Sequence, residues 1–158
     1  MRLWLPIPEA WPVLELPETP GRLVAVVPGH RDRPDLTVTI GPLEGLPDDP
    51  DVWVRAILQA NADGPVHVLH NRESRTELGW PVQLFHAVVA SAADAPVREQ
   101  RLVACYRFLD HAAAVLVRGS DTARFDAHRE MLLELLSRAR PDFRGDEPVA
   151  LAELYEAF

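Results

Sequence analysis

The chain has 158 residues, which is enough for one domain with a sizeable core and leaves little room for a second. Hydrophobic residues make up 47% of the sequence, a share that is typical of a globular protein and excludes a disordered chain. The 24 acidic residues outnumber the 16 basic ones, all arginine, so the net charge is −8. Because this surplus repels phosphate groups, we expect neither nucleic acid nor an anionic membrane as a partner.

Residues 1–22 form a proline-rich N-terminal arm in this interpretation, since five of the first 20 residues are proline. Proline has no backbone N–H to donate, so the arm can be an edge strand or an extended segment but not a helix or a central strand. Short strands are predicted next at residues 23–27 and 36–40, each ended by glycine and proline.

A helix is then predicted at residues 52–62, capped by Asp49 or Asp51. Trp53 and Ile57 lie on one face of this helix. After Gly64 and Pro65, residues 66–70 predict a strand, and the charged residues 71–78 predict a turn.

The strongest strand signal lies between residues 80 and 118. Strands are predicted at 80–90, 99–109 and 112–118, the last two joined by the turn Asp110-His111. Three consecutive strands with short connections form an antiparallel meander.

A long helix with an apolar stripe is predicted at 122–140, capped by Ser120 or Asp121, and a short amphipathic helix within the C-terminal tail 144–158. We therefore predict a single α+β domain, with an antiparallel sheet flanked by helices in a core spanning residues 23–143.

Side chains alternate along strands, which gives the meander two faces. One face is almost wholly apolar and should pack beneath the long helix. The opposite, outer face has an apolar middle and an arginine edge, a composition typical of protein-binding surfaces. It comprises Arg101, Val103, Cys105, Arg107, Leu109, Ala114, Leu116 and Arg118, with Gln83 and Phe85 extending it from the preceding strand. The alternative is that another helix or the N-terminal arm covers this face.

No motif in the sequence predicts catalysis. His67 and His70 are three apart on a predicted strand, so their rings should point to opposite faces and cannot share a metal ion. Cys105 is interpreted as a small buried hydrophobe, because no histidine is clearly placed to act as its base. We expect no enzymatic activity, no cofactor and no metal.

The compartment is inferred from what the sequence lacks. The single cysteine excludes an internal disulfide. Because no secretory or membrane-spanning pattern occurs either, the cytoplasm is the expected location.

The order of features over residues 36–143 resembles the PsbP/DcrB-like superfamily. The amphipathic helix is followed by a strand opening Gly79-Trp80-Pro81-Val82. A strand reading Arg98-Glu99-Gln100-Arg101-Leu102-Val103 comes next, and then a strand at 112–117 that leads into the final helix. The resemblance implies a PsbP/DcrB-like α/β sandwich.

This superfamily includes photosystem extrinsic subunits, envelope lipoproteins, a Ran-binding import factor and Eag-type chaperones of type VI secretion effectors. In size and expected compartment the chain is most similar to the Eag-type chaperones, which are dimeric and shield apolar segments of an effector. The resemblance thus implies a non-enzymatic adaptor or chaperone for a secreted effector or toxin, and leaves a homodimer open. Two alternatives stay open: a small-molecule-binding or enzymatic domain, and a structural subunit that docks through residues 151–158.

Overall fold

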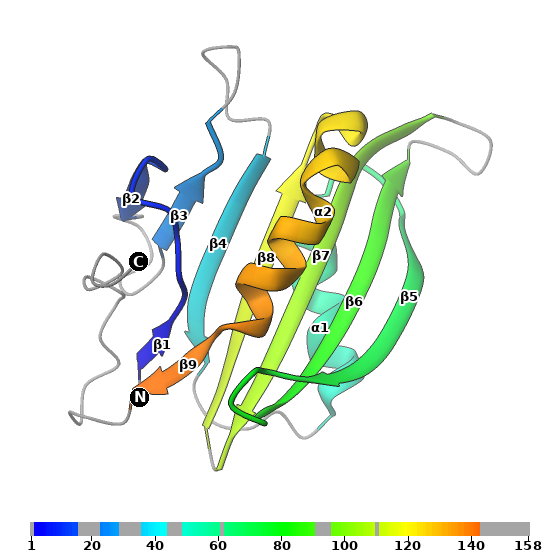
Figure 1. Cartoon of the computed structure of the whole chain (residues 1–158). Coiled ribbons are helices and arrows are strands. Elements are labelled where there is room, and N and C mark those ends of the chain that lie inside the picture. The colour runs from blue at the N-terminus through cyan, green and yellow to red at the C-terminus, as the bar shows by residue number, and fades with distance from the viewer. Residues whose placement is uncertain are drawn as a thin grey trace.

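The computed structural model describes residues 2–15, 23–28, 36–43, 49–60, 62–90, 96–109 and 111–142. Its centre is a seven-stranded antiparallel sheet with the strand order β2-β3-β4-β8-β7-β6-β5 (Figure 1). The strands are β2 (Val13–Glu15), β3 (Leu23–Val26), β4 (Leu36–Leu43), β5 (Val66–Arg75), β6 (Pro81–Ala90), β7 (Val97–Phe108) and β8 (His111–Gly119). The predicted α+β class with an antiparallel meander is confirmed.

Two helices of the described residues cover opposite faces of this sheet (Figure 1). Helix α2 (Thr122–Ser137) crosses the front face in the view of Figure 1, and α1 (Pro50–Gln59) lies behind the sheet. A separate two-stranded ribbon pairs β1 (Arg2–Trp4) with β9 (Arg140–Asp142). Because this ribbon begins at Arg140, α2 ends at Ser137 and is shorter than predicted.

The main core lies between α2 and the sheet. The apolar face predicted for the meander supplies it: Tyr106, Phe108 and Val115 are fully buried beneath α2. Leu5 and Ile7 of the N-terminal segment are buried in the same core. Each buried side chain of this size contributes roughly 1.5–3 kcal/mol, so the described part of the predicted arm is integral to the domain.

The hairpin between β7 and β8 turns one residue earlier than predicted, which shifts each cross-strand pairing by two residues. Phe108 pairs with His111, so the turn is Leu109-Asp110 instead of Asp110-His111; Asp110 itself lies outside the described residues. Leu109 has a φ of 59°, in the left-handed region that few residues other than glycine and asparagine adopt readily. A shift by two residues preserves the alternation, so every side chain keeps its predicted face.

The junction between β8 and α2 is tight. Asp121 caps α2 by accepting a hydrogen bond from the backbone N–H of Arg124 at 3.1 Å. A Cβ on Gly119 would lie 2.7 Å from a ring carbon of buried Phe125, so glycine is required for α2 to begin this close to the sheet.

Strand β5 is twice as long as predicted. It continues through Arg75 at the sheet edge, where the sequence predicts a turn. Backbone pairing with β6 keeps these charged residues in a strand. The charges are tolerated there because an edge strand can direct them to water. The chain turns only at Thr76–Gly79, where Gly79 N–H donates to the Thr76 carbonyl at 2.8 Å with a φ of 86°.

A β-bulge interrupts β5 at Leu69. Val68 pairs with Ala87 and His70 with His86, so Leu69 has no partner of its own on β6. The extra residue reverses the alternation, and His67 and His70 consequently lie on the same face of the sheet. The prediction that their rings point to opposite faces is wrong for this reason. Between the strands predicted at 80–90 and 99–109 the sequence predicts a loop at 91–98. Its last two residues belong to β7, and residues 91–95 lie outside the described residues, as does the predicted tail helix.

Candidate partner-binding site

Helix α1 closes a large part of the outer face. Val54 and Leu58 of α1 pack on Phe85, Ala87 and Val103 in a second buried cluster. At Phe85 and Val103, which are 5% and 0% exposed, the expectation of an open face is wrong and the alternative of a covering helix is confirmed. Sequence reasoning recognised the apolar face of α1 but could not place it on this face, because the contact joins residues far apart in the chain.

Arg101 fastens the C-terminal end of α1 to the sheet. Its side chain is completely buried and donates to the carbonyls of Leu58 at 2.5 Å and Ala60 at 2.6 Å. These carbonyls belong to the end of a helix, where intrahelical donors are missing. The prediction that Arg101 belongs to an exposed arginine rim is thus wrong, because its guanidinium caps α1.

Glu99 joins Arg101 to Arg118. The Glu99 carboxylate contacts Nε of Arg101 and accepts a hydrogen bond from Arg118 Nη2 at 3.0 Å. Burial by itself would raise the pKa of Glu99, but the hydrogen bonds from Arg118 and Arg101 outweigh burial and lower it. Arg118 is one-third exposed and already paired, so it too differs from the predicted free rim.

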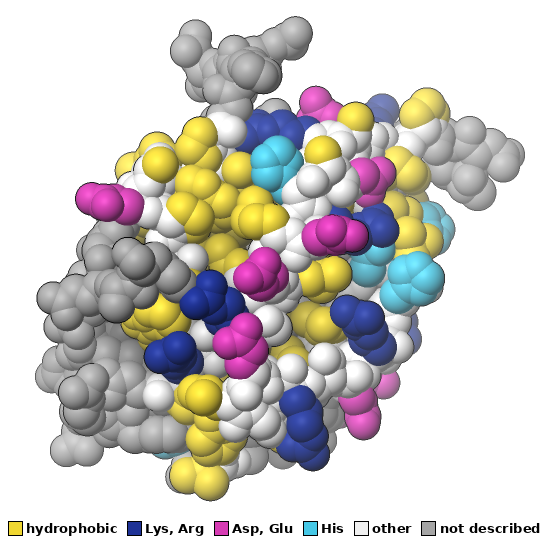
Figure 2. Space-filling view, viewed as in Figure 1, with side chains coloured by type: hydrophobic (Ala, Val, Ile, Leu, Met, Phe, Trp, Pro, Cys, Tyr) yellow, Lys and Arg dark blue, Asp and Glu magenta, His cyan; other side chains and the backbone are white. Residues whose placement is uncertain are grey.

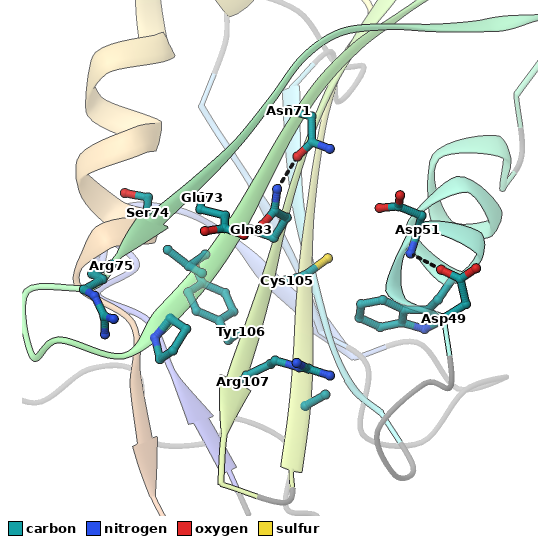
Figure 3. A pocket seen from close by; sticks show the side chains of 14 residues that line it. Asp49, Asp51, Asn71, Glu73, Ser74, Arg75, Gln83, Cys105, Tyr106 and Arg107 are labelled. Atoms are coloured by element: carbon teal, nitrogen blue, oxygen red, sulfur yellow. Dashed lines mark hydrogen bonds between the residues drawn. The ribbon is translucent and has the colours of Figure 1, made fainter.

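Beyond the N-terminal end of α1, the described residues leave a hollow on the outer face (Figure 3). A cavity of about 810 Å³, here called the outer cavity, lies between α1 and the strands β5, β6 and β7. It is lined by Asp49, Asp51, Trp53, Asn71, Glu73, Ser74, Arg75, Pro81, Val82, Gln83, Cys105, Tyr106, Arg107 and Ala112. Of the predicted binding residues, Gln83, Cys105 and Arg107 come together here, and Gln83 pairs directly with Cys105 across β6 and β7.

Two other predicted residues lie away from the outer cavity. Leu109 is 74% exposed at the β7–β8 hairpin and does not line it. Leu116 is half-buried against the cluster beneath α1.

The charges in the outer cavity are mixed. Figure 3 shows Asp49 and Asp51 on one side, at the start of α1, and Glu73, Gln83 and Arg107 on the other. Asp49 caps α1 by accepting from the backbone N–H of Asp51 at 3.0 Å. Arg107 is exposed and has no ion-pair partner among the described residues. It is therefore available to an incoming carboxylate.

The thiol in the outer cavity is buried. Burial raises the pKa of Cys105 to about 12, so the neutral thiol predominates. No group of three or more His, Cys, Asp or Glu side chains suited to a metal ion occurs in the described part of the chain. Nor is any helix of that part long and apolar enough to cross a bilayer.

Several lining residues escaped the sequence reasoning. Asn71, Glu73 and Arg75 alternate along β5 and so share the outer face. The residues between them are also polar, so the sequence shows no apolar–polar alternation there that would mark a strand. Their high polarity made a turn the simpler interpretation. Trp53 was assigned to the apolar face of its helix, and it does pack against the buried cluster while also lining the outer cavity.

No protein-family model matches the sequence, and no curated protein sequence does either. Solved structures do match. The solution structure of cyanobacterial PsbP (CyanoP) from Synechocystis superposes with a TM-score of 0.62 at 13% identity, over 86% of this chain and 84% of that one. The Ran-binding protein Mog1p of Saccharomyces cerevisiae superposes with a TM-score of 0.58 at 13% identity, over 85% of this chain and 87% of that one.

The chain has the PsbP/Mog1-like fold. A protein of unknown function from Pseudomonas aeruginosa also shares it, with a TM-score of 0.57 at 10% identity over 84% of this chain and 97% of that one. The resemblance to the PsbP/DcrB-like superfamily is thus confirmed at the level of the fold. The closer likeness to Eag-type chaperones has no support in these matches, and fold similarity at such low identity does not carry function.

Proposed function

We propose that this chain is a non-enzymatic adaptor or chaperone that binds a protein partner through the outer cavity. The observation that carries the proposal is that Trp53 and an available Arg107 line the same cavity on the outer face of the sheet. Tryptophan and arginine are the residue types that dominate binding energy at protein interfaces.

The polarity of the outer cavity supports a protein partner over a small molecule. Five of its lining residues are charged, with both signs present. Small-molecule pockets are mostly apolar with few polar groups, whereas the rims of protein interfaces are polar. The segment bound here would place a carboxylate on Arg107 and an apolar side chain beside Trp53.

We further propose which kind of protein binds in the outer cavity. The resemblance to cytoplasmic chaperones suggests a secreted effector or toxin, with the chain acting in the cytoplasm as a monomer or a homodimer. The alternative, a structural subunit of a larger assembly, would instead dock through residues 151–158, which lie outside the described residues.

The test is affinity purification of the tagged full chain from its native cells, with the co-purifying protein identified by mass spectrometry. We expect a stoichiometric partner with the wild type and its loss with Arg107→Glu, because a like charge would then meet the partner carboxylate. The matched control is Arg55→Glu, which changes an exposed arginine of α1 outside the outer cavity. Retention of the partner by Arg107→Glu, or equal loss with both variants, would overturn the proposal.

A further inference from the structure

A second concave site lies on the opposite side of the sheet. This groove, here called the α2-side groove, has a volume of about 540 Å³ and runs between α2 and the strands β5 and β6. It is lined by Leu69, His70, Asn71, Arg72, Leu84, His86, Leu102, Phe125, Arg129 and Leu133. Figure 2 shows histidine and arginine side chains gathered on the side of α2 that faces β5.

The bulge at Leu69 orients polar side chains of β5 toward the α2-side groove. His70 pairs with His86 and Arg72 with Leu84, so all four side chains project on the α2 face of the sheet. Without the extra residue, the alternation set by Val66 and Val68 would send His70 and Arg72 to the outer face instead. Bulges often re-aim side chains next to functional sites.

The floor of the α2-side groove is apolar and aromatic. Leu84, Leu102 and Phe125 are buried beneath it. The His86 ring stacks on Phe125, with 5.8 Å between ring centroids and 13° between planes, and on His70 at 6.0 Å.

A hydrogen-bond network fixes the His86 tautomer. Gln100 Nε2 donates to Asp126 Oδ1 at 3.1 Å and to the Thr122 carbonyl at 3.3 Å, so its Oε1 is left to accept. His86 Nε2 lies 2.7 Å from that oxygen and must carry the hydrogen. Burial lowers the pKa of His86, so the ring is an uncharged wall of the groove at neutral pH.

The charge of the lining is basic although the chain as a whole is acidic. Arg72 and Arg129 line the α2-side groove, and no carboxylate of the described residues does. Arg129 pairs with Asp126 at 2.9 Å, whereas Arg72 is exposed and has no ion-pair partner in the described ranges. An apolar floor with guanidinium groups above it suits a ligand with an apolar body and one anionic group.

We propose that the α2-side groove binds a monocarboxylate with an alkyl chain, whose chain lies on Leu84 and Phe125 and whose carboxylate meets Arg72 and Arg129. The site is independent of the proposed partner-binding cavity, since it lies on the other face of the sheet and shares only Asn71 with that cavity.

Calorimetric titration of the full chain with octanoate tests the proposal, with 1-octanol and octylammonium as neutral and cationic probes of the same chain length. We expect saturable binding of octanoate and weaker binding of both other probes. Arg72→Gln and Arg129→Gln should each weaken octanoate binding by about fivefold. This is the upper end of the range of effects found for largely exposed ion pairs.

Two controls separate charge recognition in the α2-side groove from folding and from changes of charge elsewhere. Arg72→Lys keeps the charge and should retain most of the affinity. Arg55→Gln, at an exposed arginine of α1 that lines neither site, should leave octanoate binding unchanged. The melting temperature of each variant confirms that it is folded. Equal binding of octanoate and 1-octanol, absence of saturable binding, or an equal loss with Arg55→Gln would overturn the proposal.

Discussion

Cys105 lies on the outer face of β7, at the edge of the cluster that α1 covers. With the pKa of its thiol raised to about 12, roughly one thiol in ten thousand is ionised at pH 8. We expect native protein to react with iodoacetamide at pH 8 about a thousandfold more slowly than protein unfolded in urea.

Mass spectrometry measures this reaction without ambiguity, because the chain has a single cysteine. The urea-unfolded chain is the control for reagent and pH. Similar rates in the native and the unfolded protein would contradict the buried position of Cys105 and the seating of α1 over it.

At the scale of single residues, local sequence signals are sufficient to predict helix caps but not the turn between β7 and β8. Asp49 caps α1 and Asp121 caps α2, each being one of the two candidates predicted, because a cap depends only on its next few neighbours. The turn residue Leu109 was not predicted, since leucine is unfavourable in the left-handed region and no local signal marks it. The pairing of β7 with β8 outweighs this local cost.

At the scale of the element, α1 depends on Arg101. Arg101→Met removes the donors to the Leu58 and Ala60 carbonyls and leaves Glu99 with one arginine instead of two. Breaking a buried charged contact by removing one partner costs about 3–5 kcal/mol. We expect the free energy of unfolding in urea to fall by about 3 kcal/mol.

Arg55→Met is the matched control, since Arg55 is an exposed arginine of the same helix. It should change the free energy of unfolding by less than about 0.5 kcal/mol. Cys105 should also react faster in Arg101→Met, because α1 is then less firmly held. Equal stability of the two variants would show that Arg101 does not hold α1.

The elements differ in how far the sequence predicts them. Strands β6, β7 and β8 follow from local alternation and short connections. Strand β5 does not, because its second half is polar and becomes a strand only through pairing with β6. The outer cavity could therefore be predicted only in part: Gln83, Cys105 and Arg107 were found, but the opposite wall was not.

For the whole molecule, the shifted pKa of His86 links stability to pH. Burial holds its folded pKa below 6.5, so in the window below pH 6.5 the unfolded chain binds the proton more readily. The stabilisation is present above pH 6.5 and is lost as the pH falls toward the folded pKa. Glu99, whose pKa is also lowered, contributes stability above pH 4.5 that is lost only in more acidic solution.

We therefore expect the free energy of unfolding to be lower at pH 5.5 than at pH 7.5, and the difference to shrink in His86→Gln, which cannot take up a proton. Urea denaturation of both proteins at both pH values measures the free energy of unfolding and hence this difference. Glu99 stays ionised in the native state across this range, so it does not account for the change. An identical pH dependence in the wild type and His86→Gln would contradict a buried neutral ring at this position.

The sequence by itself determined the class of the fold, the meander and which side chains of β7 and β8 share a face, because these follow from alternation that neighbouring residues encode. Tertiary structure alone decided which face is closed and where the two concave sites lie. The position of α1 on the sheet depends on a hydrogen bond between Arg101 and Leu58, which are 43 residues apart in the chain. The bulge at Leu69 arises only when β5 pairs with β6, and that one unpaired residue decides which polar side chains of β5 face the outer cavity and which face the α2-side groove.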